Sequence, residues 1–356
     1  MKSDNSSKNT NIEILRLLCM YCIIIHHAVL YSDILYRGGM LFNQCLANIL
    51  YIGGKLGANC FMAISAYYLV GKKLKIKRIT SIWKVTFFYG VVFFILNYIM
   101  NFRDYQIRDL FETLFPITYK SYWYVTAYVG ILMISPILNY AIDQFSEKQY
   151  RWILVSLVTM VSIPVTFFPK ANPFSDESHL LLFVLIFLIM GYYKKYGKKS
   201  INYKLLFVLS MLWMIISAVF IVLIADIFNN EGILKYATFW MKGESLPMIF
   251  AAISLTVVFI EKSIVNNKKI NSIAEGSFDI YLIHMNHFVY LWLWNTLAPI
   301  KNYYTTNSFI FRLFGSTLSI FIITLVIGKI RCIFFDFLEK KICLKNLNIL
   351  EKITFY

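Results

Sequence analysis

The chain has 356 residues, of which 59% are hydrophobic and only 15% charged, and its mean hydropathy is +0.62. A soluble fold of this composition would lack the polar side chains needed to cover its surface, which excludes the soluble globular classes. The formal net charge is +16, so the distribution of the basic residues decides whether nucleic acid is a plausible partner.

Apolar stretches of membrane-spanning length alternate with short polar segments along the whole chain. Spans are expected near 12–31, 46–70, 79–100, 122–141, 150–168, 179–193, 204–224, 245–261, 277–298 and 309–330. The 179–193 stretch is short for a span, and His179 at its start is expected to be structural or solvated. The predicted fold class is an all-α polytopic membrane protein with about ten transmembrane helices.

The basic residues distinguish the two sides of the membrane. If the N-terminus is cytoplasmic, the segments on that side carry 23 of the 35 Lys and Arg residues, and the opposite loops carry eight. Because cytoplasmic loops are enriched in Lys and Arg, both termini are predicted to be cytoplasmic and the number of spans even. The positive charge therefore reflects membrane topology, and no nucleic-acid partner is expected.

One membrane domain is expected over 12–335, between a flexible cytoplasmic tail at 1–11 and a cytoplasmic C-terminal segment at 336–356. The longest loops on the predicted outer side contain Tyr, Trp and Phe side chains, which either stack on sugar rings or form an interfacial aromatic belt. These loops are 32–45, 101–121 and 225–244. No pattern has convincing metal-ligand spacing, so no metal is expected.

The first span contains four ionisable side chains, Glu13, Arg16, His26 and His27. Charged groups are costly in hydrocarbon, so each is a candidate functional residue. Arg16 and His27 are eleven residues apart, almost three helical turns, and therefore share one helix face about 16 Å apart along the axis. His26 points about 100° away from His27, and Glu13 is placed to pair with Arg16.

Two explanations fit this arrangement. A guanidinium near the cytoplasm can bind phosphate bidentately, and a deeper imidazole can accept a proton from a hydroxyl or carry an acyl group. Alternatively, Arg16 is a snorkelling anchor and His27 hydrogen-bonds between helices.

The first span also resembles the opening of the membrane acyltransferase-3 family, the nodulation-protein-X-like O-acyltransferases. That opening reads L-D-x-L-R-x10-H, which Arg16 and His27 match, with Glu13 in place of the usual Asp. The segment 57–73 is similar to the family's F-x-x-S-G-F-L stretch: Phe61 and Ser65 match, and Ala66 stands in place of the Gly.

Three later segments extend the resemblance to about 12–330. Lys75 and Arg78 have the spacing of the family's R-x-x-R pair, with Lys replacing the first Arg. The segment 121–139 resembles the W-x-x-x-x-Y…S-P-x-L span. The segment 277–285 resembles the late S-x-x-I-Y-L-x-H pattern, with Met285 where Pro is frequent.

The resemblance implies an integral-membrane O-acetyltransferase in the bacterial cytoplasmic membrane. Such an enzyme moves an acetyl group from acetyl-CoA to a hydroxyl of a cell-surface or capsular polysaccharide, or of its lipid-linked precursor. Acetyl-CoA would be a diffusing donor, with no bound cofactor. The expected partners are acetyl-CoA, a carbohydrate acceptor and the lipid bilayer, with a separate extracytoplasmic or glycan-assembly protein as one means of completing the transfer.

By the same resemblance His27 would be the general base or the acyl relay. Arg16 would hold the phosphate end of the donor together with Lys75, Arg78 and Ser65. The secondary candidates are Glu13, His26 and His284. His284 and His287 are three residues apart, and either line the same cavity or hydrogen-bond between helices.

A membrane exporter or flippase of a polysaccharide or lipid-linked glycan is the main alternative, because many spans and aromatic outer loops would serve it equally well. Against it, one helix concentrates Arg and His, and no inverted repeat is visible in the sequence. A sensory or scaffold role has only the spans in its favour.

Overall fold

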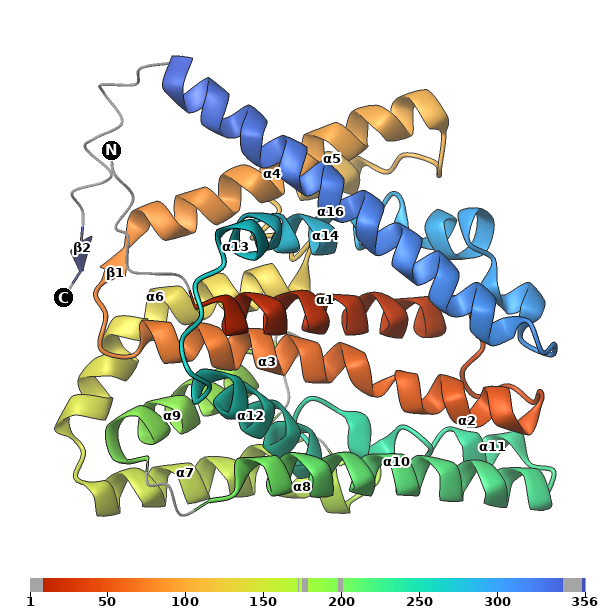
Figure 1. Ribbon diagram of the computed structural model, residues 1–356, viewed down its shortest axis with the longest axis horizontal. Helices are drawn as coiled ribbons and strands as arrows, with labels where there is room; N and C mark the ends of the chain where they lie inside the picture. The colour runs from red at the N-terminus through yellow and green to blue at the C-terminus, as the bar shows by residue number, and fades with distance from the viewer. Residues whose placement is uncertain (1–8, 172, 175–178, 198–200, 342–353, 356) are drawn as a thin grey trace.

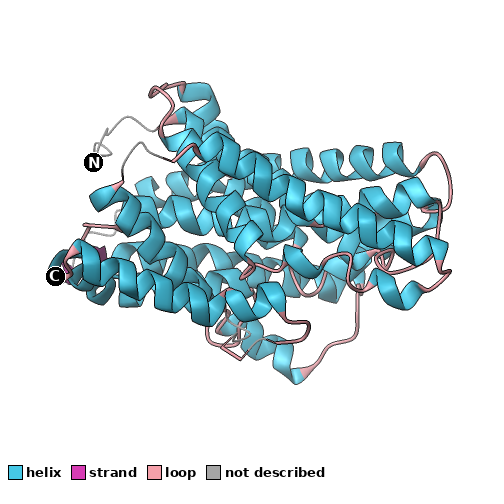
Figure 2. Cartoon of the chain, turned by 90° about the horizontal axis from the view of Figure 1, so that it is seen from below, coloured by secondary structure: helices cyan, strands magenta, loops and turns pink. Residues whose placement is uncertain are grey.

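The computed structural model describes residues 9–171, 173–174, 179–197, 201–341 and 354–355, and these are almost entirely helical (Figure 1). Most of the predicted N-terminal tail and most of the segment after residue 341 lie outside the described residues. Figure 2 shows from a perpendicular direction that the long helices run roughly along one axis, as in a bundle.

The elements follow one another with short connections. The first half comprises α1 (Thr10–Tyr31), α2 (Leu41–Leu50), α3 (Ile52–Leu69), β1 (Leu74–Lys75), α4 (Ile76–Met100), α5 (Ile107–Leu114), α6 (Trp123–Gln144), α7 (Glu147–Val161) and α8 (Ile163–Phe167). The second half comprises α9 (Leu180–Tyr196), α10 (Tyr203–Ile227), α11 (Glu231–Leu234), η1 (Phe239–Met241), α12 (Leu246–Ile260), α13 (Lys268–Ala274), α14 (Ser277–His284), α15 (Tyr290–Trp292), η2 (Leu293–Leu297), η3 (Ile300–Tyr303), α16 (Phe309–Lys341) and β2 (Thr354–Phe355). The two-residue strands β1 and β2 pair antiparallel, with Leu74 opposite Phe355.

Helix α1 occupies the centre of the bundle (Figure 1). It begins after Asn9, whose side chain accepts a hydrogen bond from the backbone amide of Asn11 and so caps the helix. It packs most extensively against α3 and also contacts α16, α13, α12 and α14. In the most apolar 18-residue stretch of each helix, 56% of α1 is buried inside the protein but only 17% of α16. Helix α1 is therefore a core helix and α16 a peripheral one.

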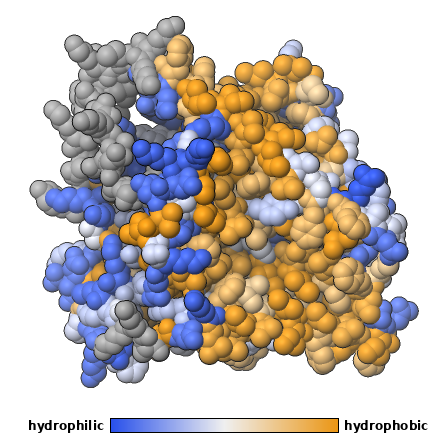
Figure 3. All heavy atoms as spheres, viewed as in Figure 1, coloured by the Kyte–Doolittle hydropathy of each residue, from blue (hydrophilic) through white to orange (hydrophobic). Residues whose placement is uncertain are grey.

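The peripheral helices present apolar side chains outwards. Ile216 and Phe220 of α10 and Phe311 and Ile330 of α16 are exposed, and Figure 3 shows a broad hydrophobic surface on this face. Hydrophilic side chains gather instead at the end of the bundle that carries β1 (Figures 1 and 3). Because a soluble protein would not expose so much apolar surface, the molecule is a multi-pass membrane protein.

Six helices of the described chain are long and apolar enough to cross a membrane, and the bent pair Glu231–Met241 and Leu246–Ile260 makes a possible seventh. Two of the ten predicted spans are interrupted. The stretch at 150–168 is divided at Ser162 into α7 and α8, because Pro164 lacks an amide hydrogen and is accommodated in the first turn of a new helix.

The stretch at 277–298 is not one continuous helix, because α14 ends at His284. Beyond this end, the side-chain oxygen of Asn286 accepts a hydrogen bond from the amide of Phe288, and its nitrogen donates to the hydroxyl of Tyr122, 2.8 Å away. An asparagine side chain that bonds to nearby backbone competes with helical hydrogen bonding and favours a turn. The following α15 and η2 are short.

Lysines of α9 complete the ends of two other helices. Lys194 donates to the carbonyl oxygens of Tyr67 and Val70 at the C-terminus of α3, and Lys195 donates to the carbonyl of Ile142 at the C-terminus of α6. The last carbonyls of a helix have no partner within the helix and carry partial negative charge, so each ammonium group stabilises the end that it contacts.

Candidate active site

A cavity of about 360 Å³ lies between α1, α3, α6 and α14. It lies in the half of the bundle that contains the C-terminal end of α1. No carboxylate is found among the described residues that line it, and its polar side chains are His26, His27, Lys55 and His179, together with several tyrosines. This is a largely aromatic chamber with basic groups at membrane depth.

His27 is held by a second imidazole. Its Nδ1 lies 2.9 Å from Nε2 of His284, while Nδ1 of His284 donates to the backbone carbonyl of Ile280. Because a carbonyl oxygen only accepts, the proton of a neutral His284 ring is on Nδ1 and its Nε2 is an acceptor. His27 therefore donates from Nδ1, which leaves the lone pair of its Nε2 available on a ring that lines the cavity.

The helix that carries His284 is fixed by a buried ion pair. Asp279 of α14 accepts two hydrogen bonds from Arg331 of α16, at 2.7 and 2.8 Å, and a third from the hydroxyl of Tyr89 at 2.8 Å. Asp279 is fully buried, and its bidentate pairing satisfies a charge that would otherwise be costly. The position of His284 is thus set by contacts one turn away from the imidazole.

His26 lies on an adjacent part of α1 and also lines the cavity. Its Nδ1 donates to the carbonyl of Tyr51 at 2.6 Å, and its ring packs on the Tyr51 ring at 4.3 Å between centroids. A Cβ at Gly54 would lie 2.3 Å from the His26 ring, so only glycine allows this approach.

A relay of Lys55, His179 and Glu244 closes one side of the cavity. Nε2 of His179 accepts a hydrogen bond from Lys55 at 3.2 Å, and its Nδ1 lies 2.6 Å from Glu244. Lys55 also lies 4.6 Å from the centroid of the Trp123 ring.

A second cavity, of about 760 Å³, adjoins the first and shares Tyr51, Lys55 and His179 with it. It is lined by the loop after α1, the segment that precedes α9 and the segment from α11 to α12. The relay therefore lies at the neck between the two cavities. Any molecule that passes from the second cavity to His27 would meet Lys55 first.

A third cavity, of about 420 Å³, lies at the opposite end of the bundle and contains Lys75, Lys77, Arg78, Ser81 and Tyr128. Two of the predicted donor-binding residues, Lys75 and Arg78, are thus brought together, and both are exposed. The Tyr128 ring stacks on the Tyr124 ring, 6.3 Å between centroids, and Tyr124 lines the His27 cavity. This tyrosine pair links the basic cavity to the buried one.

The remaining predicted donor-site residues lie between these two ends. Glu13 and Arg16 form the expected ion pair at 2.8 Å, and Arg16 is half-buried. Because α1 is unbroken from Thr10 to Tyr31, Arg16 shares the face of His27 about three turns away. Ser65 is half-buried on α3, one turn beyond the cavity residue Phe61. Neither Arg16 nor Ser65 lines one of these three cavities.

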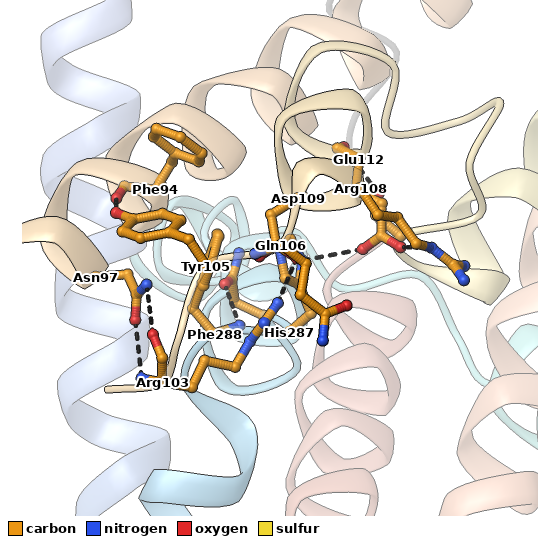
Figure 4. A network of polar contacts seen from close by, with 12 residues as sticks. Phe94, Asn97, Arg103, Tyr105, Gln106, Arg108, Asp109, Glu112, His287 and Phe288 are labelled. Atoms are coloured by element: carbon orange, nitrogen blue, oxygen red, sulfur yellow. Dashed lines mark hydrogen bonds and ion pairs between the residues drawn. The ribbon is translucent and has the colours of Figure 1, made fainter. Parts of the chain in front are cut away.

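Of the two alternatives for these histidines, His284 forms a hydrogen bond between helices, to His27, and α14 ends before His287, so the two imidazoles do not continue one helical face. Figure 4 shows His287 beside Asp109 and Glu112 of α5, at 3.9 and 3.7 Å. The three side chains could supply metal ligands within 4.8 Å of one another. Arg103 and Arg108 already pair with the two carboxylates, which makes the cluster electrostatically unfavourable for a cation.

The sequence did not predict the relay of Lys55, His179 and Glu244 or the aromatic lining of the His27 cavity. Lys55 lies within a predicted span, so the rule that singles out intramembrane charges would have identified it. Its partners His179 and Glu244 are 124 and 189 positions further along and carry no shared motif. Tyr281 stands inside the late S-x-x-I-Y-L-x-H pattern, but nothing in the sequence says that its side chain lines the cavity or that its hydroxyl is buried.

Long apolar helices around a buried imidazole site define a multi-pass membrane protein with an enzyme-like centre. A family model described as an acyltransferase domain, acyltransferase-3, matches residues 9–328, nearly the whole chain. The protein belongs to this family and is therefore a membrane acyltransferase. No curated protein and no solved structure shows a significant match to the chain.

Proposed function

We propose that the protein is an O-acetyltransferase that moves an acetyl group from acetyl-CoA to a hydroxyl of a cell-surface or capsular polysaccharide, or of its lipid-linked precursor. The observation that carries this proposal is the arrangement of His27. His27 lines the central cavity with the lone pair of Nε2 unused, and this cavity has a basic cavity toward one end of the bundle and a larger cavity toward the other.

We further infer that both termini are cytoplasmic in a bacterial inner membrane and that about ten segments cross or enter the bilayer. In support, the hydrophilic end of the molecule is the one that carries β1, β2 and the start of α1 (Figures 1 and 3). The exposed basic residues of the β1–α4 junction, Lys72, Lys73, Lys75, Lys77 and Arg78, belong to this end. An excess of Lys and Arg is typical of the cytoplasmic side.

On this orientation the third cavity is the cytoplasmic entrance for the donor. Coenzyme A carries several phosphates, and Lys75, Lys77 and Arg78 supply cations for them, Arg78 as a planar fork and the lysines as point charges. The pantetheine arm would then pass the Tyr128–Tyr124 pair toward His27, with Arg16 and Ser65 along the route. No resident cofactor is required by this scheme.

In the proposed reaction the acceptor oxygen attacks the thioester carbonyl as its proton moves to Nε2 of His27. The tetrahedral intermediate then expels the thiolate by cleavage of the carbon–sulfur bond, and the sulfur takes the proton from the imidazolium. The products are the O-acetyl sugar and free coenzyme A. His284 acts as a positioning residue, since it accepts the Nδ1 hydrogen of His27 throughout.

Tyr281 is proposed to stabilise the oxyanion. Its hydroxyl is buried and completes no hydrogen bond with another described residue; the backbone amide of Tyr124 approaches the oxygen without completing that geometry. The side chain lines the same cavity as His27. A preorganised O–H donor without a ground-state partner can donate to the charge that develops in the transition state.

The test replaces His27 by Ala. We expect transfer to fall by a factor of roughly 10² to 10⁴, the usual range for loss of a general base, and the O-acetyl signals in the NMR spectrum of the surface glycan to disappear while the polymer stays at the surface. His287→Ala is the matched control, because His287 lies in a separate cluster, and at equal membrane abundance it should retain acetylation.

Unchanged acetylation in the His27 variant would refute the proposal, and loss of the polymer itself would favour an exporter. Rapid-quench mass spectrometry separates two routes: an acyl relay would leave an acetyl group on His27, whereas base catalysis would not.

A further inference from the structure

The second cavity has the largest volume of the three, about 760 Å³, and lies at the proposed outer end of the path to His27. Its walls combine aromatic rings with amino groups. Tyr36, Tyr236 and Phe239 contribute rings, and the Tyr36 hydroxyl is fixed by a 2.7 Å hydrogen bond to Thr238. Rings of this kind offer flat apolar faces to sugars.

Lysine is the commonest charged residue of this cavity. Lys55, Lys170, Lys235 and Lys242 line it, and Glu244 is the one carboxylate among its described lining residues. Glu244 is already engaged with His179 at 2.6 Å. The described walls therefore carry a surplus of positive charge at the mouth of a path into the protein.

This surplus cannot be attributed to membrane orientation. The predicted outer loops hold few basic residues, and four of them, Arg37, Arg103, Arg108 and Lys301, each pair with a carboxylate. Lys170, Lys235 and Lys242 form no ion pair with any described residue, and all three converge on the second cavity. On the side of the membrane that is poor in basic residues, several lysines that meet at one cavity and pair with no described carboxylate favour an anionic ligand.

We propose that the second cavity binds an anionic sugar residue of the acceptor glycan, such as one that bears a carboxylate. This inference rests on the proposed function, whose acceptor it specifies. Lys170, Lys235 and Lys242 hold the charged substituent, and the rings of Tyr36 and Tyr236 pack on the sugar. The neighbouring hydroxyl is then directed through the neck at Lys55 toward Nε2 of His27.

The experiment measures binding by the purified full-length protein in zwitterionic nanodiscs, so that it does not depend on turnover. The probes are tetragalacturonate and its carboxyl-reduced, neutral counterpart. We expect the wild type to prefer the anionic oligomer by about tenfold or more, with the preference falling as ionic strength rises, because each charge-assisted contact contributes substantially to affinity. The triple variant Lys170→Gln/Lys235→Gln/Lys242→Gln should lose the preference, whereas Lys301→Gln, an exposed lysine paired with Asp33, should keep it.

Equal binding of the two oligomers by the wild type, or a preference that survives in the triple variant, would overturn the inference. If the lysines instead hold lipid headgroups, the triple variant would lose retention of phosphatidylglycerol while neither oligomer is preferred, and this too would overturn it. Acetyl transfer from acetyl-CoA is assayed in parallel. A charge preference without any transfer would defeat the proposed function alone, and transfer without a charge preference would defeat this inference alone.

Discussion

The chemistry of His27 depends on a residue 257 positions away. The carbonyl of Ile280 fixes the tautomer of His284, and His284 in turn fixes that of His27. Without this contact the His27 ring would exist as a mixture of two tautomers, of which only one leaves the lone pair on Nε2. A neutral imidazole can thus be oriented for proton abstraction without a carboxylate.

Replacement of His284 tests this relation. In His284→Gln the side-chain oxygen can still accept the Nδ1 hydrogen of His27, whereas in His284→Leu it cannot. We expect kcat to fall further in the Leu variant, by about tenfold relative to Gln, with KM for acetyl-CoA unchanged in both, because misplacement of a base affects mainly the chemical step. Equal kcat values for the two variants would show that His284 only fills space.

Tyr281→Phe removes a single hydroxyl from the cavity. If that hydroxyl donates to the oxyanion, kcat should fall by about 10²-fold with little change in KM. The matched control is Tyr150→Phe, which removes a buried hydroxyl that donates to the carbonyl of Leu188 away from the cavity. The control should lose about 1 kcal/mol of stability and no activity. A normal kcat in the Tyr281→Phe variant would show that the Tyr281 hydroxyl does not donate to the oxyanion.

Spacing along α1 predicted two facts about single residues correctly, the Glu13–Arg16 pair and the common face of Arg16 and His27. Both follow from the period of one helix. Lys55 and Tyr281, which line the cavity together with His27, come from other helices. The period of one helix does not determine which helices become its neighbours. The cavity could therefore be anticipated only on its α1 side.

Among the elements, α1 and α3 define the site because they approach each other so closely. A Cβ at Gly57 would lie 2.9 Å from the carbonyl oxygen of Cys19, and one at Gly54 would collide with the His26 ring. Small residues on the contact face let two membrane helices pack closely, and van der Waals contact then contributes most of their association.

Gly54→Ala should push His26 away from Tyr51 and separate the two helices at the cavity. We expect a loss of roughly 1 to 3 kcal/mol in stability, as for other overpacked cores, together with a fall in transfer activity, both followed in detergent by thermal unfolding and acetyl transfer. Gly315→Ala is the control, since a Cβ there meets no atom within 4 Å. Equal unfolding temperatures for the two variants would contradict the close approach.

Hydropathy located the long helices well but not the breaks. The expected spans at 12–31 and 204–224 correspond to α1 and α10. The spans at 150–168 and 277–298 are interrupted, because average hydropathy does not register one proline or an asparagine that caps a turn. The second break shapes the candidate site, because it places His284 at a helix end beside His27 and directs His287 toward Asp109 and Glu112 of α5.

At the scale of the whole molecule, the orientation of the bundle in the membrane determines which cavity faces the cytoplasm. Single cysteines at the two ends test it. Lys72→Cys lies at the basic end and Asn302→Cys at the other, and both positions are exposed. In intact cells a membrane-impermeant maleimide should label Asn302→Cys and leave Lys72→Cys unlabelled until the cells are opened, since cytoplasmic loops are the basic ones. The parent protein supplies the background from native cysteines, and the reverse pattern would invert the proposed donor and acceptor sides.

The neck formed by Lys55, His179 and Glu244 has a consequence for how the acyl donor would be used in the proposed reaction. In the proposed reaction, a water molecule beside His27 would compete with the acceptor for the thioester, and acetyl-CoA would be consumed without modification of a glycan. The relay joins α3 to the segments that precede α9 and α12 by direct hydrogen bonds, and two of its residues, Lys55 and His179, line both cavities. Under the proposed function, the relay is placed to make turnover conditional on an acceptor, because a sugar hydroxyl that reaches His27 would displace the water that could otherwise react with the donor.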